Sequence, residues 1–141
     1  MPKIYTAHAT AVGGRDGHTE TDDKVVSFDL SAPGSGKLGT NPEQLFAAGY
    51  AACFGSAVQH VAKLQKLDFG AVEVKADVDL NKDDTGFSLS VTLNVALPNL
   101  DQAAAQKLVE DAHQVCPYSK ATRGNITVTL QANGQSVAKA A

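Results

Sequence analysis

The sequence predicts an α+β fold in which a mainly antiparallel sheet surrounds one long buried central helix. Residues 40–54 form the longest apolar segment of the 141-residue chain, and residues 45–62 contain no Asp, Glu, Lys or Arg. Elsewhere, apolar and polar residues alternate with a period of two in several short runs, a pattern typical of strands with one face in water. Strands around a long helix, followed by a hairpin, a helix and a strand, indicate the α+β class.

The first forty residues predict a hairpin, a further strand and a loop. Residues 3–12 are predicted to form a strand, and the glycine-rich segment 13–17 then reverses the chain. Residues 26–31 alternate between apolar and polar, which predicts a half-buried strand. Residues 32–39 are rich in Gly, Pro and Ser and predict an exposed loop before the long helix.

The long helix is predicted to start at Asn41. Asn41 can cap its first turn, Pro42 suits the first helical position, and Gln44 can complete a capping box with Asn41. Apolar residues occur nearly all round this helix, which predicts burial on most of its sides. Polar side chains interrupt the apolar run, so we do not expect a membrane span.

The second half of the chain predicts a hairpin and a final strand. Residues 72–81 and 87–95 alternate regularly on either side of a turn at 82–86, which indicates an antiparallel pair with one wet face. Residues 126–130 also alternate and lead to the turn signal at 133–134.

A second helix is predicted between the hairpin and the last strand. Asp101 can cap it and Pro117 can end it. Its predicted apolar stripe comprises Ala104 or Ala105, Leu108, Val109, Ala112, Val115 and Cys116.

Length and charge limit the classes of function. The chain fits a single domain, residues 1–141, with a tail from about residue 135 that is expected to fray. The formal net charge is −3 and no run of Lys or Arg occurs, which indicates neither a nucleic-acid partner nor an anionic membrane surface. The first eight residues lack the apolar core of a secretory signal, which predicts a cytoplasmic protein.

Two cysteines are the candidate reactive groups. A thiol is a nucleophile only as the thiolate, so it needs a nearby cation or helix N-terminus and access to substrate. Cys53 lies in the middle of its predicted helix and needs a cation from elsewhere in the fold. Cys53 and Cys116 can equally be inert core side chains, so the residues alone leave catalytic, sensing and structural roles open.

Metal binding is not expected. The four histidines, His8, His18, His60 and His113, are scattered, and neither C-x-x-C nor H-x-x-x-H spacing occurs. His113 and Cys116 share a helix face but supply only two ligands. No phosphate-binding glycine motif is present either.

Three motifs resemble, in the same order, those of the organic hydroperoxide resistance proteins. These are GGRDG at 13–17, GTNPEQLFAAGYAACF at 39–54 and AHQVCPYSKATRGNI at 112–126. The superfamily of those proteins also contains the osmotically inducible peroxidases, and the turn around Arg15 favours the hydroperoxide resistance subgroup. With the strands between the motifs, the resemblance covers nearly the whole chain.

This resemblance implies a thiol peroxidase that reduces alkyl or fatty-acyl hydroperoxides to alcohols. It implies that Cys53 is the peroxidatic cysteine, Cys116 the resolving cysteine, and Arg15 with Glu43 the polar pair that activates Cys53. It also implies a disulfide between the two cysteines that a lipoylated protein reduces again, without metal, haem or flavin.

Helix geometry combined with these implied roles predicts an intertwined homodimer. Glu43 and Cys53 are ten residues apart, which is about 15 Å of helical rise, too far for a glutamate side chain. Unless the helix breaks at Gly49, the Glu43 and Arg15 that serve a given Cys53 come from a second chain. Two other classes stay open, a cysteine-based redox sensor and a module that binds hydrophobic ligands with inert thiols.

Overall fold

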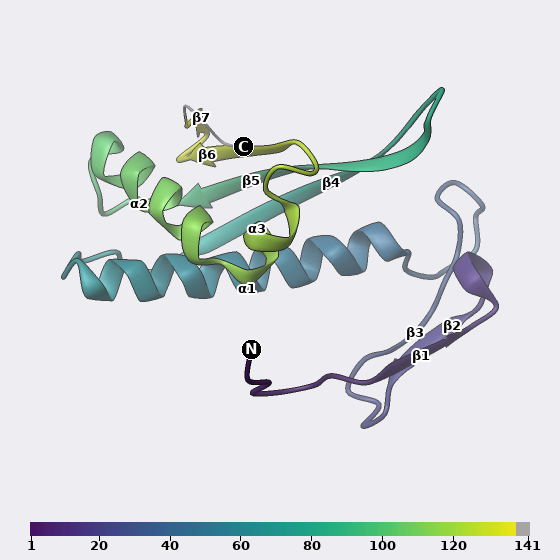
Figure 1. Ribbon diagram of the computed structural model, residues 1–141. Helices are drawn as coiled ribbons and strands as arrows, with labels where there is room; N and C mark the ends of the chain where they lie inside the picture. The colour runs from purple at the N-terminus through teal and green to yellow at the C-terminus, as the bar shows by residue number, and fades with distance from the viewer. Residues whose placement is uncertain (138–141) are drawn as a thin grey trace. The chain divides into compact units, whose positions relative to one another are not determined.

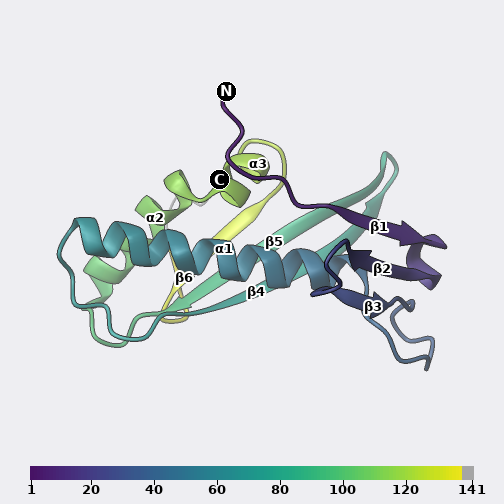
Figure 2. The ribbon, with the colours of Figure 1, turned by 90° about the horizontal axis from the view of Figure 1, so that it is seen from below.

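The computed structural model describes residues 1–137, which contain helices and two sheets and confirm the α+β class (Figures 1 and 2). The residues fall into two compact units that divide between Leu45 and Phe46. We describe each unit by itself.

The N-terminal unit holds a three-stranded antiparallel sheet. Strands β1 (Ala9–Val12), β2 (His18–Thr21) and β3 (Ser27–Asp29) pair in sequence order, and the short 3₁₀ helix η1 (Gly14–Asp16) joins the first two. The predicted hairpin around η1 is confirmed, but residues 3–8 are not part of the first strand. The predicted third strand is present but shorter, and its predicted half-buried face is only partly formed, because Phe28 is exposed while Leu30, just after the strand, is buried.

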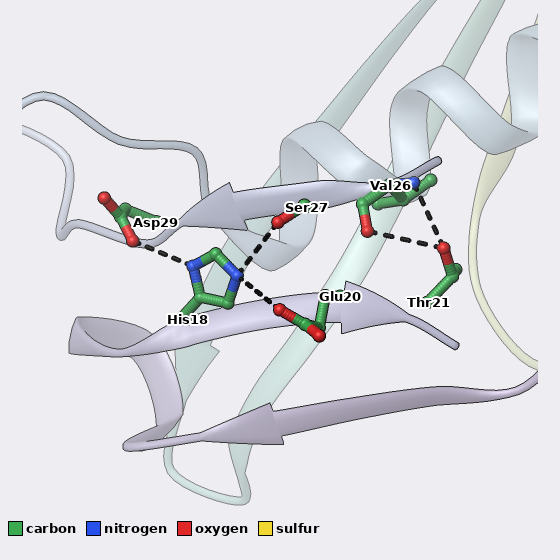
Figure 3. Close-up of polar contacts among 6 residues, drawn as sticks. All are labelled: His18, Glu20, Thr21, Val26, Ser27 and Asp29. Atoms are coloured by element: carbon green, nitrogen blue, oxygen red, sulfur yellow. Dashed lines mark hydrogen bonds and ion pairs between the residues drawn. The ribbon is translucent and has the colours of Figure 1, made fainter. Parts of the chain in front are cut away.

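Polar side chains hold β2 to β3 (Figure 3). The Nδ1 atom of His18 lies 2.8 Å from the Asp29 carboxylate, and its Nε2 atom lies 3.1 Å from both Glu20 and the Ser27 hydroxyl. Hydrogen bonding to Asp29 and, more weakly, to Glu20 raises the pKa of His18. The imidazolium can donate to both carboxylates at once, so the protonated ring fits this site best.

Helix α1 (Pro42–Leu64) begins where the sequence predicts. The Asn41 side chain accepts a hydrogen bond from the Gln44 backbone N–H at 2.8 Å, which confirms the predicted cap. The predicted capping box is not formed, because the Gln44 side chain instead accepts a hydrogen bond from the Thr40 hydroxyl at 2.8 Å. No break occurs at Gly49.

Helix α1 is buried on one face only. That face consists of Tyr50, Phe54, Ala57, Val58, Val61 and Ala62. A stripe of small residues, Ala48, Ala52 and Ser56, is exposed and is called here the small-residue stripe. The expectation of burial on most sides is therefore wrong for the single chain, since nothing within residues 1–137 buries this stripe.

The C-terminal unit is built on a four-stranded sheet. Strands β4 (Glu73–Asp83) and β5 (Gly86–Ala96) form the predicted antiparallel hairpin, with a turn shortened to residues 84–85. Strand β6 (Val128–Ala132) runs parallel to β5, and β7 (Gln135–Ser136) returns antiparallel. The sheet is thus mixed, while its remaining pairs are antiparallel as predicted.

One face of this sheet carries the core. On β5, Val91, Leu93 and Val95 are fully buried, while the polar residues between them are only partly covered. The buried apolar residues of α1 and of α2 (Gln102–Val115) belong to the same cluster. The core therefore lies between these two helices and one sheet face.

Helix α2 follows the prediction at its start and departs from it at its end. The Asp101 carboxylate caps it by accepting the Ala104 N–H at 2.8 Å. In its last turn Val115 is 52% exposed, while His113 is buried in its place. The His113 ring faces the core, where its Nδ1 atom lies 2.8 Å from the hydroxyl of the buried Ser119.

Pro117 ends α2 as predicted but also starts α3 (Pro117–Thr122), which the sequence analysis missed. The expected fraying from residue 135 is wrong for residues 135–137, because β7 pairs with β6 and Val137 is buried. The rest of that tail, residues 138–141, lies outside the described residues.

Within residues 1–137, no helix has the length and apolar character needed to cross a membrane. The same part of the chain contains no group of three or more His, Cys, Asp or Glu side chains arranged to hold a metal ion.

Candidate active site

The two cysteines meet in the C-terminal unit. Cys53 lies on α1 and is partly buried, and Cys116 lies fully buried at the junction of α2 and α3. Both are free thiols, and the Cys116 thiol points toward Cys53 with 3.5 Å between the sulfur atoms. The packing that an intrachain disulfide requires, the end of the second predicted helix against the middle of the first, is therefore present.

The surroundings of Cys53 favour its neutral thiol. Burial raises the pKa of Cys53, a hydrogen bond from the Tyr118 backbone N–H lowers it, and the neighbouring Cys116 raises it again. The net pKa lies above the ordinary value for a thiol. Chemistry through a Cys53 thiolate therefore requires a further positive charge next to the sulfur.

Arg15 and Glu43 form a bidentate ion pair within the N-terminal unit. The Arg15 Nη1 and Nη2 atoms donate to the two Glu43 carboxylate oxygens at 2.8 and 3.1 Å. Arg15 projects from η1, and its side chain is 51% exposed, while that of Glu43, in the first turn of α1, is only 14% exposed. These two parallel hydrogen bonds fix the plane of the guanidinium and leave part of the guanidinium accessible to a ligand.

The shape of the η1 turn brings Arg15 into this position. Gly13 and Gly14 both adopt positive φ, 85° and 59°, conformations that other residues rarely take. A Cβ atom on Gly17 would lie 1.7 Å from the Val12 carbonyl oxygen, so the close return of the chain also requires glycine.

An apolar groove of about 510 Å³ lies against α3, the helix that follows Cys116. Carbon-rich side chains dominate its walls, among them Phe46 of α1, Pro117 and Tyr118 of α3, and Ile126. Two of its wall residues are linked to the cysteines, because Pro117 directly follows Cys116 and the Tyr118 N–H bonds to Cys53, but neither cysteine lines the groove itself. Its size and apolar walls suit a small ligand with a hydrocarbon body.

The sequence analysis named Cys53, Cys116, Arg15 and Glu43 as candidate site residues but did not predict the groove. The structure brings Cys53 to Cys116 and Arg15 to Glu43. The walls of the groove come from α1, β5, α3 and the segment after it, which are distant in sequence. The only local sequence signal for α3, which forms one of these walls, was Pro117, because proline favours the first position of a helix.

Comparisons with known proteins place this geometry in a family. The profile of the family described as OsmC-like protein matches residues 34–131. The organic hydroperoxide resistance protein OhrB of Bacillus subtilis is 53% identical over 133 residues, which cover 91% of this chain and 97% of that protein. The chain belongs to the organic hydroperoxide resistance family. A second member, from Xanthomonas axonopodis pv. citri, is 53% identical over 132 residues, covering 90% of this chain and 93% of its own.

Solved structures of the family share the fold. The crystal structure of Bacillus subtilis OhrB superposes with a TM-score of 0.86 at 53% identity, covering 91% of this chain and 98% of that one. A Vibrio cholerae structure described as a candidate organic hydroperoxide resistance protein gives a TM-score of 0.89 at 46% identity, covering 96% of each chain. That structure holds a captopril molecule in one of its active sites.

Proposed function

We propose that this protein is a dithiol-dependent peroxidase that reduces organic hydroperoxides to alcohols through Cys53 and Cys116. The observation that carries the proposal is the 3.5 Å separation of the two sulfur atoms, and an apolar groove whose walls include Pro117 and Tyr118 supports it. The groove suits an alkyl or fatty-acyl hydroperoxide better than hydrogen peroxide, because its walls offer mainly carbon.

In the first step the Cys53 thiolate attacks the distal oxygen of the hydroperoxide. A sulfur–oxygen bond forms, the oxygen–oxygen bond breaks, and the alkoxide leaves as the alcohol after taking up a proton. The sulfur is oxidised to sulfenic acid and the peroxide is reduced by two electrons. Negative charge grows on the departing oxygen, so a guanidinium beside it stabilises the transition state.

In the second step Cys116 resolves the sulfenic acid. Its sulfur forms a bond with the sulfur of Cys53, the sulfur–oxygen bond breaks, and the hydroxide leaves as water with the Cys116 thiol proton. A lipoyl-type dithiol on a partner protein then exchanges with this disulfide, which restores both thiols and oxidises the dithiol. The protein supplies no metal or bound cofactor in this scheme, and recycling by such a dithiol fits a cytoplasmic location.

Arg15 is the proposed source of the positive charge that Cys53 needs, and Glu43 holds its guanidinium in place. Because α1 continues without a break from Pro42 to Leu64, Glu43 and Cys53 of one chain are separated by about 15 Å of helical rise. We therefore propose that the Arg15 and Glu43 pair of one chain serves Cys53 of a second chain in a homodimer.

Two uncovered surfaces support the dimer. The small-residue stripe on α1 is exposed, and the N-terminal sheet has no buried strand residue, although Phe28 and Val12 are large and apolar. A second chain that covers both would remove this apolar area from water. Small side chains on the stripe also allow a second helix to approach closely.

Mixing tests the shared site. Cys53→Ser chains and Glu43→Ala chains are each expected to be poorly active, and refolding them together should restore one intact site per heterodimer. A protein that is monomeric at working concentration, or a mixture without recovered activity, would refute the shared site but not the thiol chemistry.

A two-way assay tests the activity itself. Consumption of an organic hydroperoxide and of hydrogen peroxide is measured with dihydrolipoamide, thioredoxin or glutathione as reductant. We expect the organic substrate with dihydrolipoamide to be turned over fastest. Equal slow turnover with every dithiol would instead indicate a redox sensor.

A further inference from the structure

A buried polar cluster lies next to the cysteine pair. In the C-terminal unit the fully or nearly fully buried polar side chains are those of His113, Ser119 and Thr122, and the hydroxyl of buried Tyr50 points at them. Burying polar groups is costly unless they are hydrogen-bonded. The cluster therefore reflects a specific arrangement of hydrogen bonds and not a general preference for polar residues in a core.

Ser119 is the centre of this cluster. Its Oγ atom lies 2.8 Å from the Tyr50 hydroxyl and 2.8 Å from Nδ1 of His113. The Tyr50 hydroxyl also lies 3.1 Å from the Thr122 hydroxyl, which in turn donates to the Ser119 carbonyl at 3.2 Å. Tyr50 belongs to α1 and His113 to α2, so the Ser119 hydroxyl joins α3 to both longer helices.

Helix α3 needs these contacts to keep its orientation. It has six residues, too few to be stable as an isolated helix in water. At its other end the Arg123 guanidinium donates to the His113 carbonyl, a second tie to α2. Cys116 precedes α3 directly, and its carbonyl accepts the Lys120 N–H, so the position of this cysteine depends on α3.

The same short helix also touches Cys53. The Tyr118 N–H, in its first turn, donates to the Cys53 sulfur and favours the thiolate. Any shift of α3 therefore moves two groups relative to Cys53 at once, the Cys116 thiol and this backbone donor.

We propose that Ser119 is a positioning residue which, through its hydrogen bonds to Tyr50 and His113, holds Cys116 and the Tyr118 N–H against Cys53. The catalytic importance of this positioning rests on the proposed function. Ser119 acts through α3 and touches no reacting atom. Its loss should therefore affect disulfide closure more than the fold itself.

The test compares Ser119→Ala and Tyr50→Phe with Val109→Ala. Tyr50→Phe keeps the ring in the core and removes only the hydroxyl, so it serves if Ser119→Ala fails to fold. Val109 is equally buried on α2 but carries no polar group, so its truncation controls for simple loss of stability. Each variant is equilibrated in glutathione redox buffers, and the fraction with the Cys53 to Cys116 disulfide is measured by mass spectrometry.

The glutathione equilibrium gives the effective concentration of one cysteine thiol at the other, which measures how readily the disulfide closes. We expect this effective concentration to fall about tenfold in Ser119→Ala and Tyr50→Phe and to change little in Val109→Ala. Equal changes in all three variants would overturn the positioning role. The glutathione equilibrium does not require peroxidase activity. A wild-type protein that fails to reduce hydroperoxides would therefore refute the proposed function and still leave this inference tested.

A second readout follows Cys53 alone. In a Cys116→Ser background, the rate of Cys53 alkylation is measured against pH. Ser119→Ala is expected to move the midpoint of that profile to higher pH, because the Tyr118 N–H no longer faces the sulfur. Val109→Ala is expected to leave the midpoint in place, and a midpoint unmoved by Ser119→Ala would contradict the proposal.

Discussion

Cys53 and Cys116 face each other with 3.5 Å between their sulfur atoms, although 63 residues separate them along the chain. One thiol comes from the middle of α1, and the other from the junction at which α2 gives way to α3. This pairing makes the two thiols chemically unequal, since Cys53 is partly accessible while Cys116 is fully buried.

That inequality predicts different outcomes for two serine variants. Cys53→Ser is expected to abolish hydroperoxide turnover, whereas Cys116→Ser still allows one round of oxidation, because only Cys53 is accessible to substrate. Thiol counting after one equivalent of an organic hydroperoxide distinguishes them. If Cys53→Ser retains near-normal activity, Cys53 is not the peroxidatic residue.

Removing the charge of Arg15 should slow the first step. Arg15→Met is expected to lower kcat/KM on the order of a hundredfold, the effect of losing one donor to a developing oxyanion. Arg15→Lys keeps the charge but loses the bidentate contact with Glu43, so an intermediate loss is expected. The matched control is Lys107→Met, which breaks an exposed ion pair with Asp111 on α2 and should not change the rate.

Oxidation should stabilise the protein. A disulfide across 63 residues is expected to contribute about 4 kcal/mol to the free energy of unfolding by the loop-entropy relation. Urea unfolding of the peroxide-treated and the reduced protein measures this difference. The Cys116→Ser variant should show no gain, and a wild type that loses both thiols without any gain would contradict the intrachain bond.

The raised pKa of His18 predicts a pH-dependent contribution of this side chain to the free energy of unfolding. Asp29 and then Glu20 raise its folded pKa above the unfolded value, so its contribution is complete below about pH 6.5 and is lost as the pH rises through the folded pKa. On deprotonation one ring nitrogen can only accept a hydrogen bond, and Ser27 is the neighbour that can donate it. In the wild type, the denaturant concentration at the unfolding midpoint should therefore fall as the pH rises through the pKa of His18, and this fall should be smaller in His18→Gln. An equal fall in both proteins would disprove the assignment.

Two glycines of α1 provide a matched pair that tests the groove. A Cβ atom at position 49 would lie 2.6 Å from the Tyr118 hydroxyl oxygen, so Gly49→Ala must displace the Tyr118 side chain that lines the groove. At position 55 the nearest atom is a Val74 methyl at 3.6 Å, an ordinary contact. Gly55→Ala should stabilise the helix by about 0.5 to 1 kcal/mol without changing KM.

Gly49→Ala, in contrast, is expected to raise KM for bulky hydroperoxides more than for small ones. Kinetics with two hydroperoxides of different size measure this. Identical KM ratios in wild type and Gly49→Ala would show that the bound substrate does not contact Tyr118.

Local signals predicted most of the fold. Asn41 and Asp101 each cap the helix that the sequence indicated, and the β4 and β5 alternation gave the hairpin. The parallel pairing of β6 with β5 was not predictable, because alternation fixes which face of a strand is buried but not the direction of its neighbour. The inward turn of His113 was missed for a similar reason, since its main partner, Ser119, belongs to a helix that was not expected.

The candidate residues of the site came from the sequence motifs, whereas their geometry came from the structure. The motifs pointed to Cys53, Cys116, Arg15 and Glu43. The pairing of Arg15 with Glu43 was expected from the implied roles, and the structure shows it within one chain. The distance between the thiols and the walls of the groove required the structure, because both depend on contacts between segments far apart in sequence.

The parallel strand pair has a consequence for how the protein matures. The β4 and β5 hairpin joins neighbouring segments and can assemble early, whereas β6 can join β5 only after the intervening crossover, with α2 and α3, has folded. Cys116 lies inside that crossover, so during synthesis Cys53 leaves the ribosome before its partner exists. If Cys53 reacts as proposed, a newly made chain has no second thiol to resolve its oxidation until the Cys116 segment has packed against α1. Pulsed thiol labelling during refolding should find Cys53 unprotected after the hairpin has formed, and simultaneous protection would exclude this order of assembly.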